Sequence, residues 1–387
     1  MKIIIAPDSF KESLTAMQVA QAIEKGFQQV FSSAEYLKLP MADGGEGTVQ
    51  SMVDATQGEI VEVEVTGPLG DKVLAHYGIL GGSDRAEKAV AVIEMASASG
   101  LHLVPRAQRD PYVTTSYGTG ELIKDVLDRG IEHIILGLGG SATNDAGLGM
   151  AQALGIRLLD VSGHPLGAGG LALMDLETVD LSQCHPKLAH CQIEVACDVT
   201  NPLCGENGAS AIFGPQKGAT QDMINKLDAA LGHFADVMTK SGFLDQRDVP
   251  GVGAAGGMGF AMKSLLNAEL KPGIAIVMQA VNFAQQLQGA DLVITGEGRI
   301  DGQTVFGKTP MGVLTQANLA KVPCIAIAGC FGDGAQAILE QGMKAIFPII
   351  PGLAELDQVL SEAEQNLTFT ARNIAASMAL AQQLNAQ

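Results

Sequence analysis

Five carboxylate residues occur in turns that follow predicted strands, and three of these residues lie in glycine-rich turns. The five residues are Asp8, Asp43, Glu46, Asp198 and Asp301. Any one of them alone would be interpreted as a helix cap or a turn former. Phosphoryl transfer, however, uses carboxylates to hold Mg²⁺ and to accept the proton of the attacking hydroxyl group. Five carboxylates in comparable positions therefore indicate this chemistry, and we expect Asp43, Asp198 and Asp301 to share the two tasks.

Four basic residues lie in the same kind of turn: Lys11, Lys217, Arg299 and Lys308. Cations are needed to bind both the transferring phosphoryl group and an acidic acceptor. We expect Lys11 and Arg299 to hold the carboxylate of the acceptor or the phosphoryl group, and Lys308 to bind a phosphate. An ordinary surface side chain is the alternative for each of them, and this alternative is strongest for Lys217.

Residues 137–149 form a glycine-rich stretch that joins a predicted strand to a predicted helix. This geometry directs backbone N–H groups toward an anion at the positive end of the helix. The stretch therefore predicts a cradle for nucleotide phosphates, with Asp145 as a helix cap or a metal ligand. A tight turn whose glycines serve only close packing is the alternative. The proposed phosphate-binding residues of this stretch are Gly139, Gly140, Ser141, Thr143 and Asn144.

Residues 302–309 match the P-loop pattern G-x-x-x-x-G-K-[ST] letter for letter. A P-loop follows its strand directly, whereas residues 296–301 intervene here. Pro310 also makes Thr309 a natural N-cap with proline at the first helical position. We interpret the match as accidental, although Lys308 can still bind a phosphate.

The elements that must position these residues follow two patterns. Short apolar runs alternate with helical segments at both ends of the chain, which predicts five parallel strands, two near the start and three after residue 290. Residues 59–66 and 72–80 alternate in polarity, as half-exposed antiparallel strands do. We predict an α/β fold in which a flavodoxin-like parallel-sheet domain, 1–60 plus 290–387, is interrupted by a second α/β domain with a mixed sheet, 61–289.

Composition limits the partners of this protein. A length of 387 residues, 47% of them hydrophobic, suggests two cores. The net charge of −18 argues against nucleic acid as a partner, but a few cations and Mg²⁺ can still create a local site for a small anion. No apolar run reaches the length that a membrane span requires, and the first apolar run ends after four residues, which argues against a signal peptide. We therefore expect a soluble, cytoplasmic protein.

Six sequence motifs follow one another along the chain. They occupy residues 7–15 (PDSFKESLT), 41–48 (MADGGEGT), 139–145 (GGSATND), 196–202 (ACDVTNP), 212–218 (IFGPQKG) and 296–301 (GEGRID). Together these motifs resemble the type I glycerate kinases of bacteria. The resemblance implies phosphorylation of D-glycerate with ATP and Mg²⁺ in the breakdown of glyoxylate or sugar acids. It implies 2-phosphoglycerate as the usual product, rather than 3-phosphoglycerate, and two α/β domains with the site between them.

Two other functions stay open from the chemistry of the chain alone. A nucleotide-dependent dehydrogenase of a hydroxy acid would need a G-x-G-x-x-G turn after a strand, followed by an acidic residue about 20 positions later, and the sequence lacks this arrangement. A two-domain sensor of small acids would bind glycerate without turning over ATP. The residues also leave the oligomeric state open, a homodimer included.

Overall fold

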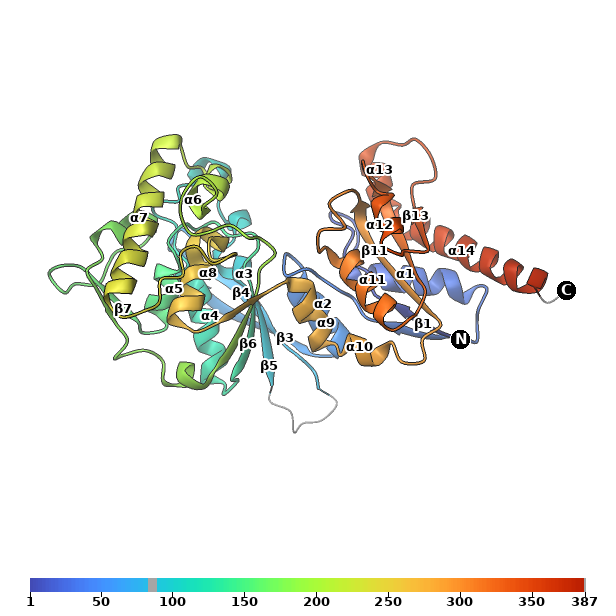
Figure 1. The fold of residues 1–387 in the computed structure, drawn as a ribbon, viewed down its shortest axis with the longest axis horizontal. Helices are drawn as coiled ribbons and strands as arrows, with labels where there is room; N and C mark the ends of the chain where they lie inside the picture. The colour runs from blue at the N-terminus through green and yellow to red at the C-terminus, as the bar shows by residue number, and fades with distance from the viewer. Residues whose placement is uncertain (83–88, 386–387) are drawn as a thin grey trace. The chain divides into compact units, whose positions relative to one another are not determined.

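The computed structural model describes residues 1–82 and 89–385. Contacts between Cα atoms divide the chain into two compact units, which we call the first and the second unit (Figure 1). The first unit contains residues 1–43, 50–56 and 274–387, and the second contains residues 44–49 and 57–273. The domain boundaries 1–60 plus 290–387 and 61–289 stay a prediction. Among the described residues, no helix is long and apolar enough to cross a membrane.

The first unit is built on a five-stranded sheet in which every neighbouring pair is parallel. The strand order β2–β1–β11–β12–β13 is the flavodoxin-like order 2-1-3-4-5 when the strands of this unit are counted along the chain. The prediction of two strands near the start and three after residue 290 is therefore confirmed. The strands are β1 (Lys2–Ile5), β2 (Glu35–Lys38), β11 (Leu292–Ile300), β12 (Cys324–Phe331) and β13 (Ala345–Pro348).

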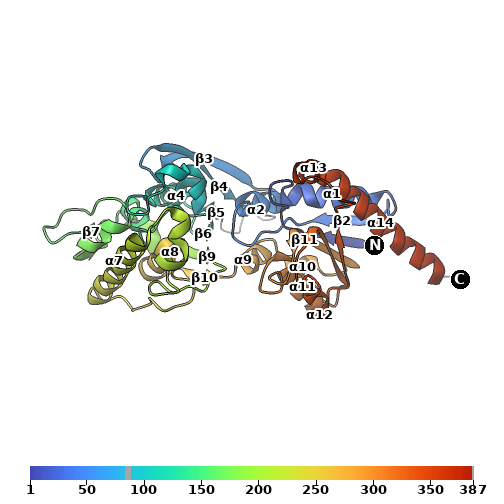
Figure 2. The same ribbon diagram turned by 90° about the horizontal axis from the view of Figure 1, so that it is seen from above.

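Helices cover both faces of this sheet. Figure 2 shows α1 (Ala16–Gln28), α13 (Leu356–Ser361) and α14 (Ala363–Asn385) on one side. The other side carries α10 (Phe283–Gln286), α11 (Thr309–Leu319) and α12 (Ala337–Glu340). Isoleucines and valines of the central strands and of α1 are buried between these layers, as expected for parallel strands covered on both faces.

Helix caps are predicted at the N-termini of two helices, α1 and α11. Thr15 and Gln18 form the expected capping box at the start of α1. The prediction that Thr309 caps α11 is wrong, because Lys308 occupies the N-cap position. The hydroxyl group of Thr309 instead donates a hydrogen bond to Asp8 Oδ2 at 2.6 Å.

The second unit contains a six-stranded mixed sheet in the order β10–β9–β6–β5–β4–β3. The pairs β3–β4 and β4–β5 are antiparallel, and the other three pairs are parallel. The predicted mixed sheet and the predicted antiparallel segments are therefore confirmed. The strands are β3 (Glu59–Thr66), β4 (Lys72–Ile79), β5 (Val90–Glu94), β6 (His133–Gly137), β9 (Gln192–Ala196) and β10 (Glu269–Lys271), and a separate ribbon pairs β7 (Arg157–Leu159) with β8 (Thr178–Asp180).

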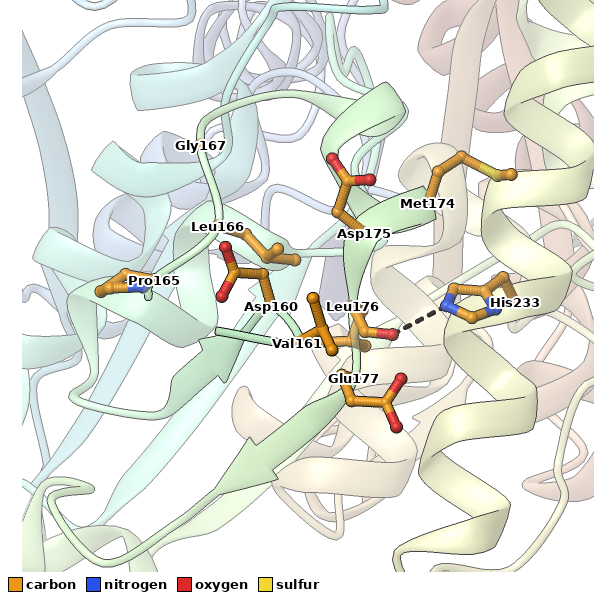
Figure 3. Close-up of a pocket in the computed structure, with 10 residues that line it drawn as sticks. All are labelled: Asp160, Val161, Pro165, Leu166, Gly167, Met174, Asp175, Leu176, Glu177 and His233. Carbon is orange, nitrogen blue, oxygen red and sulfur yellow. Dashed lines mark hydrogen bonds between the residues drawn. The ribbon is translucent and has the colours of Figure 1, made fainter. Parts of the chain in front are cut away.

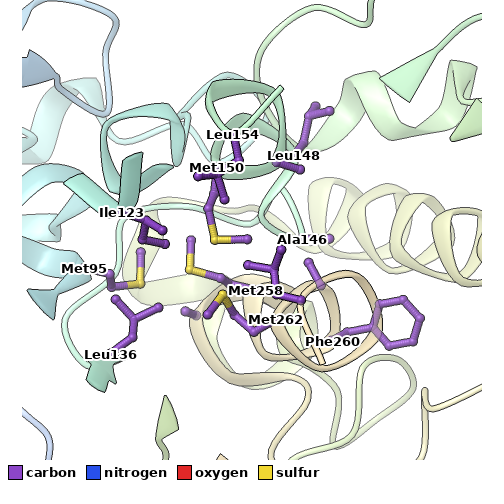
Figure 4. Close-up of a cluster of buried hydrophobic side chains, with 14 of the residues drawn as sticks. Met95, Ile123, Leu136, Ala146, Leu148, Met150, Leu154, Met258, Phe260 and Met262 are labelled. Carbon is purple, nitrogen blue, oxygen red and sulfur yellow. The ribbon is translucent and has the colours of Figure 1, made fainter. Parts of the chain in front are cut away.

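The core of the second unit is rich in methionine. Met95, Met150, Met258 and Met262 converge with leucine and isoleucine side chains between α5 and α8 (Figure 4). Unbranched methionines fill irregular space, which suits the interrupted backbone of α8, where three successive residues have left-handed φ values. The helices of this unit are α3 (Met95–Ser99), α4 (Tyr117–Asp128), α5 (Leu148–Ala153), α6 (Ala209–Phe213), α7 (Gln221–Lys240) and α8 (Ala254–Leu265), whereas α2 (Thr48–Thr56) and α9 (Gly273–Ala280) pass from the second unit into the first.

Candidate functional site

Two acidic residues lie at the point where the strand order in the sheet of the first unit reverses. Asp8 follows β1, and Glu297 lies on the neighbouring strand β11. The backbone N–H of Asp8 donates to the carbonyl of Gly296 at 2.8 Å, which fixes the two residues next to each other. In sheets of this order, ligands bind outside the carboxyl ends of the strands at the point where the strand order reverses, which here lies between β1 and β11.

Both carboxyl oxygens of Asp8 accept hydrogen bonds. Oδ2 accepts a hydrogen bond from Thr309, and Oδ1 accepts one from the backbone N–H of Ser9 at 2.7 Å. Burial raises the pKa of Asp8 to about 6, and the nearby charge of Asp43 acts in the same direction. A protonated or a charged Asp8 is therefore accessible near neutral pH.

The carboxyl group of Glu297 has a similar environment. Its Oε1 accepts a hydrogen bond from Thr304 Oγ1 at 2.6 Å. Burial raises the pKa of Glu297 to about 7, the hydrogen bond from Thr304 and the cation Lys308 oppose this rise, and Asp8 and Asp301 add to it. A carboxyl group with a pKa near neutrality is typical of acid–base catalysis.

The structure places five of the predicted site residues in the first unit. Arg299 and Asp301 form an ion pair, with Arg299 Nε and Asp301 Oδ2 3.6 Å apart. Asp301 also accepts a hydrogen bond from the backbone N–H of Gln303 at 2.9 Å. Lys11 is exposed in the turn that follows Asp8. Asp43 acts electrostatically on Asp8, and Lys308 acts electrostatically on Glu297, so carboxylates and cations lie near one another in this unit.

The carboxylates of this protein suit Mg²⁺ only if other ligands complete its coordination shell. Among residues 1–82 and 89–385, no group of three or more histidine, cysteine, aspartate or glutamate side chains is close enough to hold a metal ion alone. Mg²⁺ usually takes only one or two protein carboxylates and completes its shell with phosphate and water oxygens. Asp43 and Asp301 in the first unit and Asp198 in the second have the chemistry for this, and their role as ligands stays a prediction.

The glycine-rich turn of the second unit is built around a buried lysine. Lys217 Nζ donates hydrogen bonds to Ser141 Oγ at 2.9 Å and to the carbonyl of Thr143 at 2.6 Å. The side chain is only 2% exposed, so the expectation of an ordinary surface lysine at this position is wrong. Burial lowers the pKa of Lys217 to about 7, and the carboxylate of Asp145 partly opposes this effect.

The side chain of Asp145 is buried beside the start of α5, whose N-cap residue is Gly147. The carboxylate of Asp145 accepts hydrogen bonds from Ser116 and from the backbone N–H groups of Gly147 and Gly149. Burial raises the pKa of Asp145, and these hydrogen bonds oppose the rise. Because the carboxylate satisfies N–H groups at the start of α5, a phosphate at this turn would have to use the residues before Asp145.

Those preceding residues differ in exposure. Gly139 and Gly140 are exposed, and Gly140 has a φ of 71°, which glycine adopts without strain. Ser141, Thr143 and Asn144 are buried. Thr143 Oγ1 and Asn144 Oδ1 are enclosed without a hydrogen-bond partner in the described part of the chain, so the turn keeps unused hydrogen-bonding capacity. The binding of phosphate by these five residues stays a prediction.

Asp198 lies at the carboxyl end of β9, as expected from the sequence. Its Oδ1 accepts a hydrogen bond from the backbone N–H of Gly273 at 2.9 Å. The side chain is exposed, which is compatible with a ligand role.

A separate hollow of about 390 Å³ lies beside α7 and the β7–β8 ribbon (Figure 3). Asp160, Asp175 and Glu177 line it, and His233 Nε2 donates to the carbonyl of Leu176 at 2.8 Å. None of the predicted site residues contributes to its wall, and its lining contains no lysine or arginine to bind an anionic substrate.

The sequence does not single out Glu297, and it favours a surface position for Lys217 among the four basic turn residues. Glu297 is the acidic residue of Gly-Glu-Gly at the end of a predicted strand, and that resemblance to residues 45–47 was the available signal. Lys217 lies in a tight 3₁₀ turn at Pro215–Lys217, and this turn is shaped by Gly214, Pro215 and Gly218. Sequence alone cannot show that such a turn directs the lysine inward.

Comparisons with known proteins agree over the whole chain. A model of the glycerate kinase family matches residues 3–379. A glycerate kinase from Haemophilus influenzae is 56% identical over 379 residues, which cover 98% of this chain and 99% of the relative. The glycerate 2-kinase of Escherichia coli K12 is 53% identical, with 98% of each chain covered. A solved structure of a candidate glycerate kinase 2 from Salmonella typhimurium LT2 has a TM-score of 0.90 at 53% identity, with 99% of each chain covered.

Proposed function

The chain belongs to the glycerate kinase family, and from this premise we propose that it transfers the γ-phosphoryl group of ATP to D-glycerate. Family membership makes it a kinase that acts on glycerate. The use of ATP and Mg²⁺, the D-isomer and the position of transfer belong to the proposal. We propose 2-phosphoglycerate as the product, with 3-phosphoglycerate as the alternative, and the name of the Escherichia coli relative supports transfer to the 2-hydroxyl group.

One observation carries the proposal: acidic and basic side chains gather at the carboxyl ends of β1 and β11. Asp8, Asp43, Glu297 and Asp301 lie within electrostatic reach of Lys308 or of one another. Phosphoryl transfer depends on positioning and on the neutralisation of developing charge, and it needs an acceptor for the hydroxyl proton. This mixture of carboxylates and cations meets those needs.

In this proposal the candidate residues bind three things: the acceptor, the metal ion and the nucleotide. Lys11 and Arg299 hold the carboxylate of glycerate or the transferring phosphoryl group. Asp43, Asp198 and Asp301 bind Mg²⁺ and orient or deprotonate the hydroxyl group. When bound, Mg²⁺ neutralises negative charge on the phosphates. The nucleotide phosphates are assigned to Lys308 and to Gly139, Gly140, Ser141, Thr143 and Asn144.

The proposed chemistry also suggests a cellular setting. A kinase that uses ATP and a small sugar acid would work in the cytoplasm, in the breakdown of glyoxylate or sugar acids. Its partners would be small molecules, because the net charge of −18 disfavours nucleic acid. A homodimer stays a prediction that sedimentation of the purified protein would test.

A coupled assay tests the proposal directly. The purified protein is mixed with ATP, Mg²⁺ and D-glycerate, and ADP is measured. Enolase is then added, first alone and then with phosphoglycerate mutase. Conversion by enolase alone identifies 2-phosphoglycerate, whereas a requirement for the mutase identifies 3-phosphoglycerate.

The two alternative functions predict different results in the same assay. A sensor of small acids would bind glycerate without forming ADP. A hydroxy-acid dehydrogenase would change the absorbance of NAD or NADP on addition of glycerate. Either result in the absence of ADP formation would contradict the proposed kinase activity.

A further inference from the structure

The buried carboxyl groups of Asp8 and Glu297 differ in how many of their oxygens are engaged. Asp8 accepts hydrogen bonds on both oxygens, from Ser9 and Thr309. Glu297 accepts one on Oε1, from Thr304. Within residues 1–82 and 89–385, no hydrogen bond is made to Glu297 Oε2. Of these two carboxyl groups, only that of Glu297 therefore has an oxygen that accepts no hydrogen bond within the described residues, and this oxygen can take a proton without losing a hydrogen bond.

The position of Glu297 allows a substrate to reach that oxygen. Its side chain is partly exposed, although most of it is enclosed by the first unit. It lies on β11 beside the end of β1, where this sheet order places ligands. Thr304 fixes its orientation, because the same hydroxyl oxygen that donates to Glu297 accepts a hydrogen bond from the backbone N–H of Asp301 at 3.1 Å.

We propose that Glu297 is the general base of the reaction and that its Oε2 accepts the proton of the attacking hydroxyl group of glycerate. This assignment rests on the proposed function and narrows it. The three aspartates Asp43, Asp198 and Asp301 are then left with metal binding and orientation. Thr304 is a positioning residue, since it acts through Glu297.

Phosphoryl transfer to glycerate forms one bond to phosphorus and breaks another. A lone pair of the glycerate hydroxyl oxygen forms a bond to the γ-phosphorus of ATP. The bond between this phosphorus and the β–γ bridging oxygen breaks, and its electron pair leaves with ADP. The hydroxyl proton moves to Glu297 Oε2 and is later released to water.

The charges that face Glu297 suit this task. Asp8 and Asp301 disfavour a further negative charge, whereas Lys308 stabilises one. Together with burial they hold the pKa of Glu297 at about 7. A base with a pKa near the working pH is charged often enough to act and basic enough to accept the proton.

The first test replaces the base without changing its shape. Glu297→Gln keeps an oxygen for Thr304 and removes the proton acceptor. We expect kcat to fall by about 100-fold or more, the range for loss of a general base. Equilibrium binding of D-glycerate and of ATP, measured by calorimetry, should remain unchanged. Glu340→Gln, an exposed glutamate of the same unit, is the control and should keep the wild-type kcat.

A second variant keeps the test decisive if the glutamine substitution harms folding. Glu297→Ala creates space for a small acid, so added formate should restore part of the lost kcat. The same formate should not improve Glu297→Gln, because the amide fills the space. Rescue by formate is a response that a merely structural residue would not give.

The outcomes separate the two proposals. If wild-type protein forms ADP with glycerate and Glu297→Gln keeps most of that activity, the base assignment is wrong and the kinase proposal stands. A parallel loss of glycerate binding and kcat without formate rescue also overturns the base assignment. If the wild type forms no ADP, the proposed kinase function itself fails.

Discussion

Lys217 donates a hydrogen bond from a buried ammonium group to the hydroxyl of Ser141, 76 positions earlier in the chain. The same ammonium group also donates to the carbonyl of Thr143. A buried lysine is costly unless it is hydrogen-bonded, and here it joins the 3₁₀ turn at Pro215–Lys217 to the glycine-rich turn. The shape of the proposed phosphate-binding turn therefore depends on a residue outside it.

Replacement of this lysine should destabilise the protein. Lys217→Met leaves the carbonyl of Thr143 without its donor, which costs about 1–3 kcal/mol. The free energy of unfolding from urea melts measures the effect. Lys344→Met, at an exposed lysine of the first unit, is the control and should leave stability unchanged.

The stability difference between wild type and Lys217→Met should depend on pH. The folded-state pKa of about 7 lies below the ordinary value of 10.5, so the unfolded state binds more protons between these values. The wild type should therefore gain stability as pH rises from about 7 to about 10, by at most about 1.4 kcal/mol per pH unit. Lys217→Met should lack this gain. Parallel curves for the two proteins would contradict a buried lysine with a lowered pKa.

Two of the proposed metal-binding aspartates should be needed for turnover. Asp43→Asn and Asp301→Asn should each lower kcat by about two orders of magnitude or more, the range expected for lost positioning of metal or hydroxyl group. The coupled assay measures kcat, and circular dichroism checks that each variant is folded. Asp357→Asn, on an exposed part of α13, is the matched control. A folded variant with nearly normal turnover removes that aspartate from the site.

The hydroxyl group of Thr304 should set the pH dependence of the reaction. Its hydrogen bond favours the charged form of Glu297 and so lowers the pKa of that carboxyl. Thr304→Val removes the donor, and the pKa should rise. The acidic limb of the kcat profile should then move to higher pH. Thr315→Val, at an exposed position of α11, should leave the profile in place. An unmoved limb in Thr304→Val would show that Glu297 does not control it.

A glycine next to the proposed base should be intolerant of substitution. A Cβ atom at Gly296 would lie 1.9 Å from the carbonyl oxygen of Ile327 on the neighbouring strand. Because backbone atoms cannot move aside cheaply, Gly296→Ala should lower the free energy of unfolding by about 3 kcal/mol, the upper end of the usual range for overpacking, or prevent folding. Gly352→Ala, where an added Cβ meets nothing within 4 Å, should be nearly neutral. Thermal unfolding compares the two variants, and equal melting temperatures would refute the predicted clash.

Much of the fold follows from patterns visible in the sequence. Continuous apolar runs such as residues 3–5 and 324–328 belong to buried parallel strands, because both faces of the sheet are covered by helices. The alternation in residues 59–66 marks an antiparallel strand with one exposed face. The periodicity of apolar residues identifies these elements because each apolar residue occupies a position that faces the core.

The candidate site was less predictable, because its properties arise from contacts between distant segments. Thr309 has the sequence signature of a helix cap, yet its hydroxyl group meets Asp8 across 301 positions. The turn around Lys217 has the composition of a surface turn, yet the lysine side chain is buried and donates to Ser141 and Thr143. The pKa of Glu297 is raised by burial and by the charge of Asp8, and neither effect can be predicted from the residues next to Glu297 in the sequence.

The long chain separation between β1 and β11 has a consequence for synthesis on the ribosome. Thr295 donates a hydrogen bond from its hydroxyl to the carbonyl of Ala6, 289 positions earlier. At about 5–20 residues per second, β1 waits roughly 15–60 s for its neighbour to be made. During this time one edge of β1 lacks its partner strand, and the nascent chain there is open to wrong pairing. The first unit is therefore expected to need protection by chaperones until its C-terminal half emerges, whereas residues 57–273 are continuous and can fold earlier.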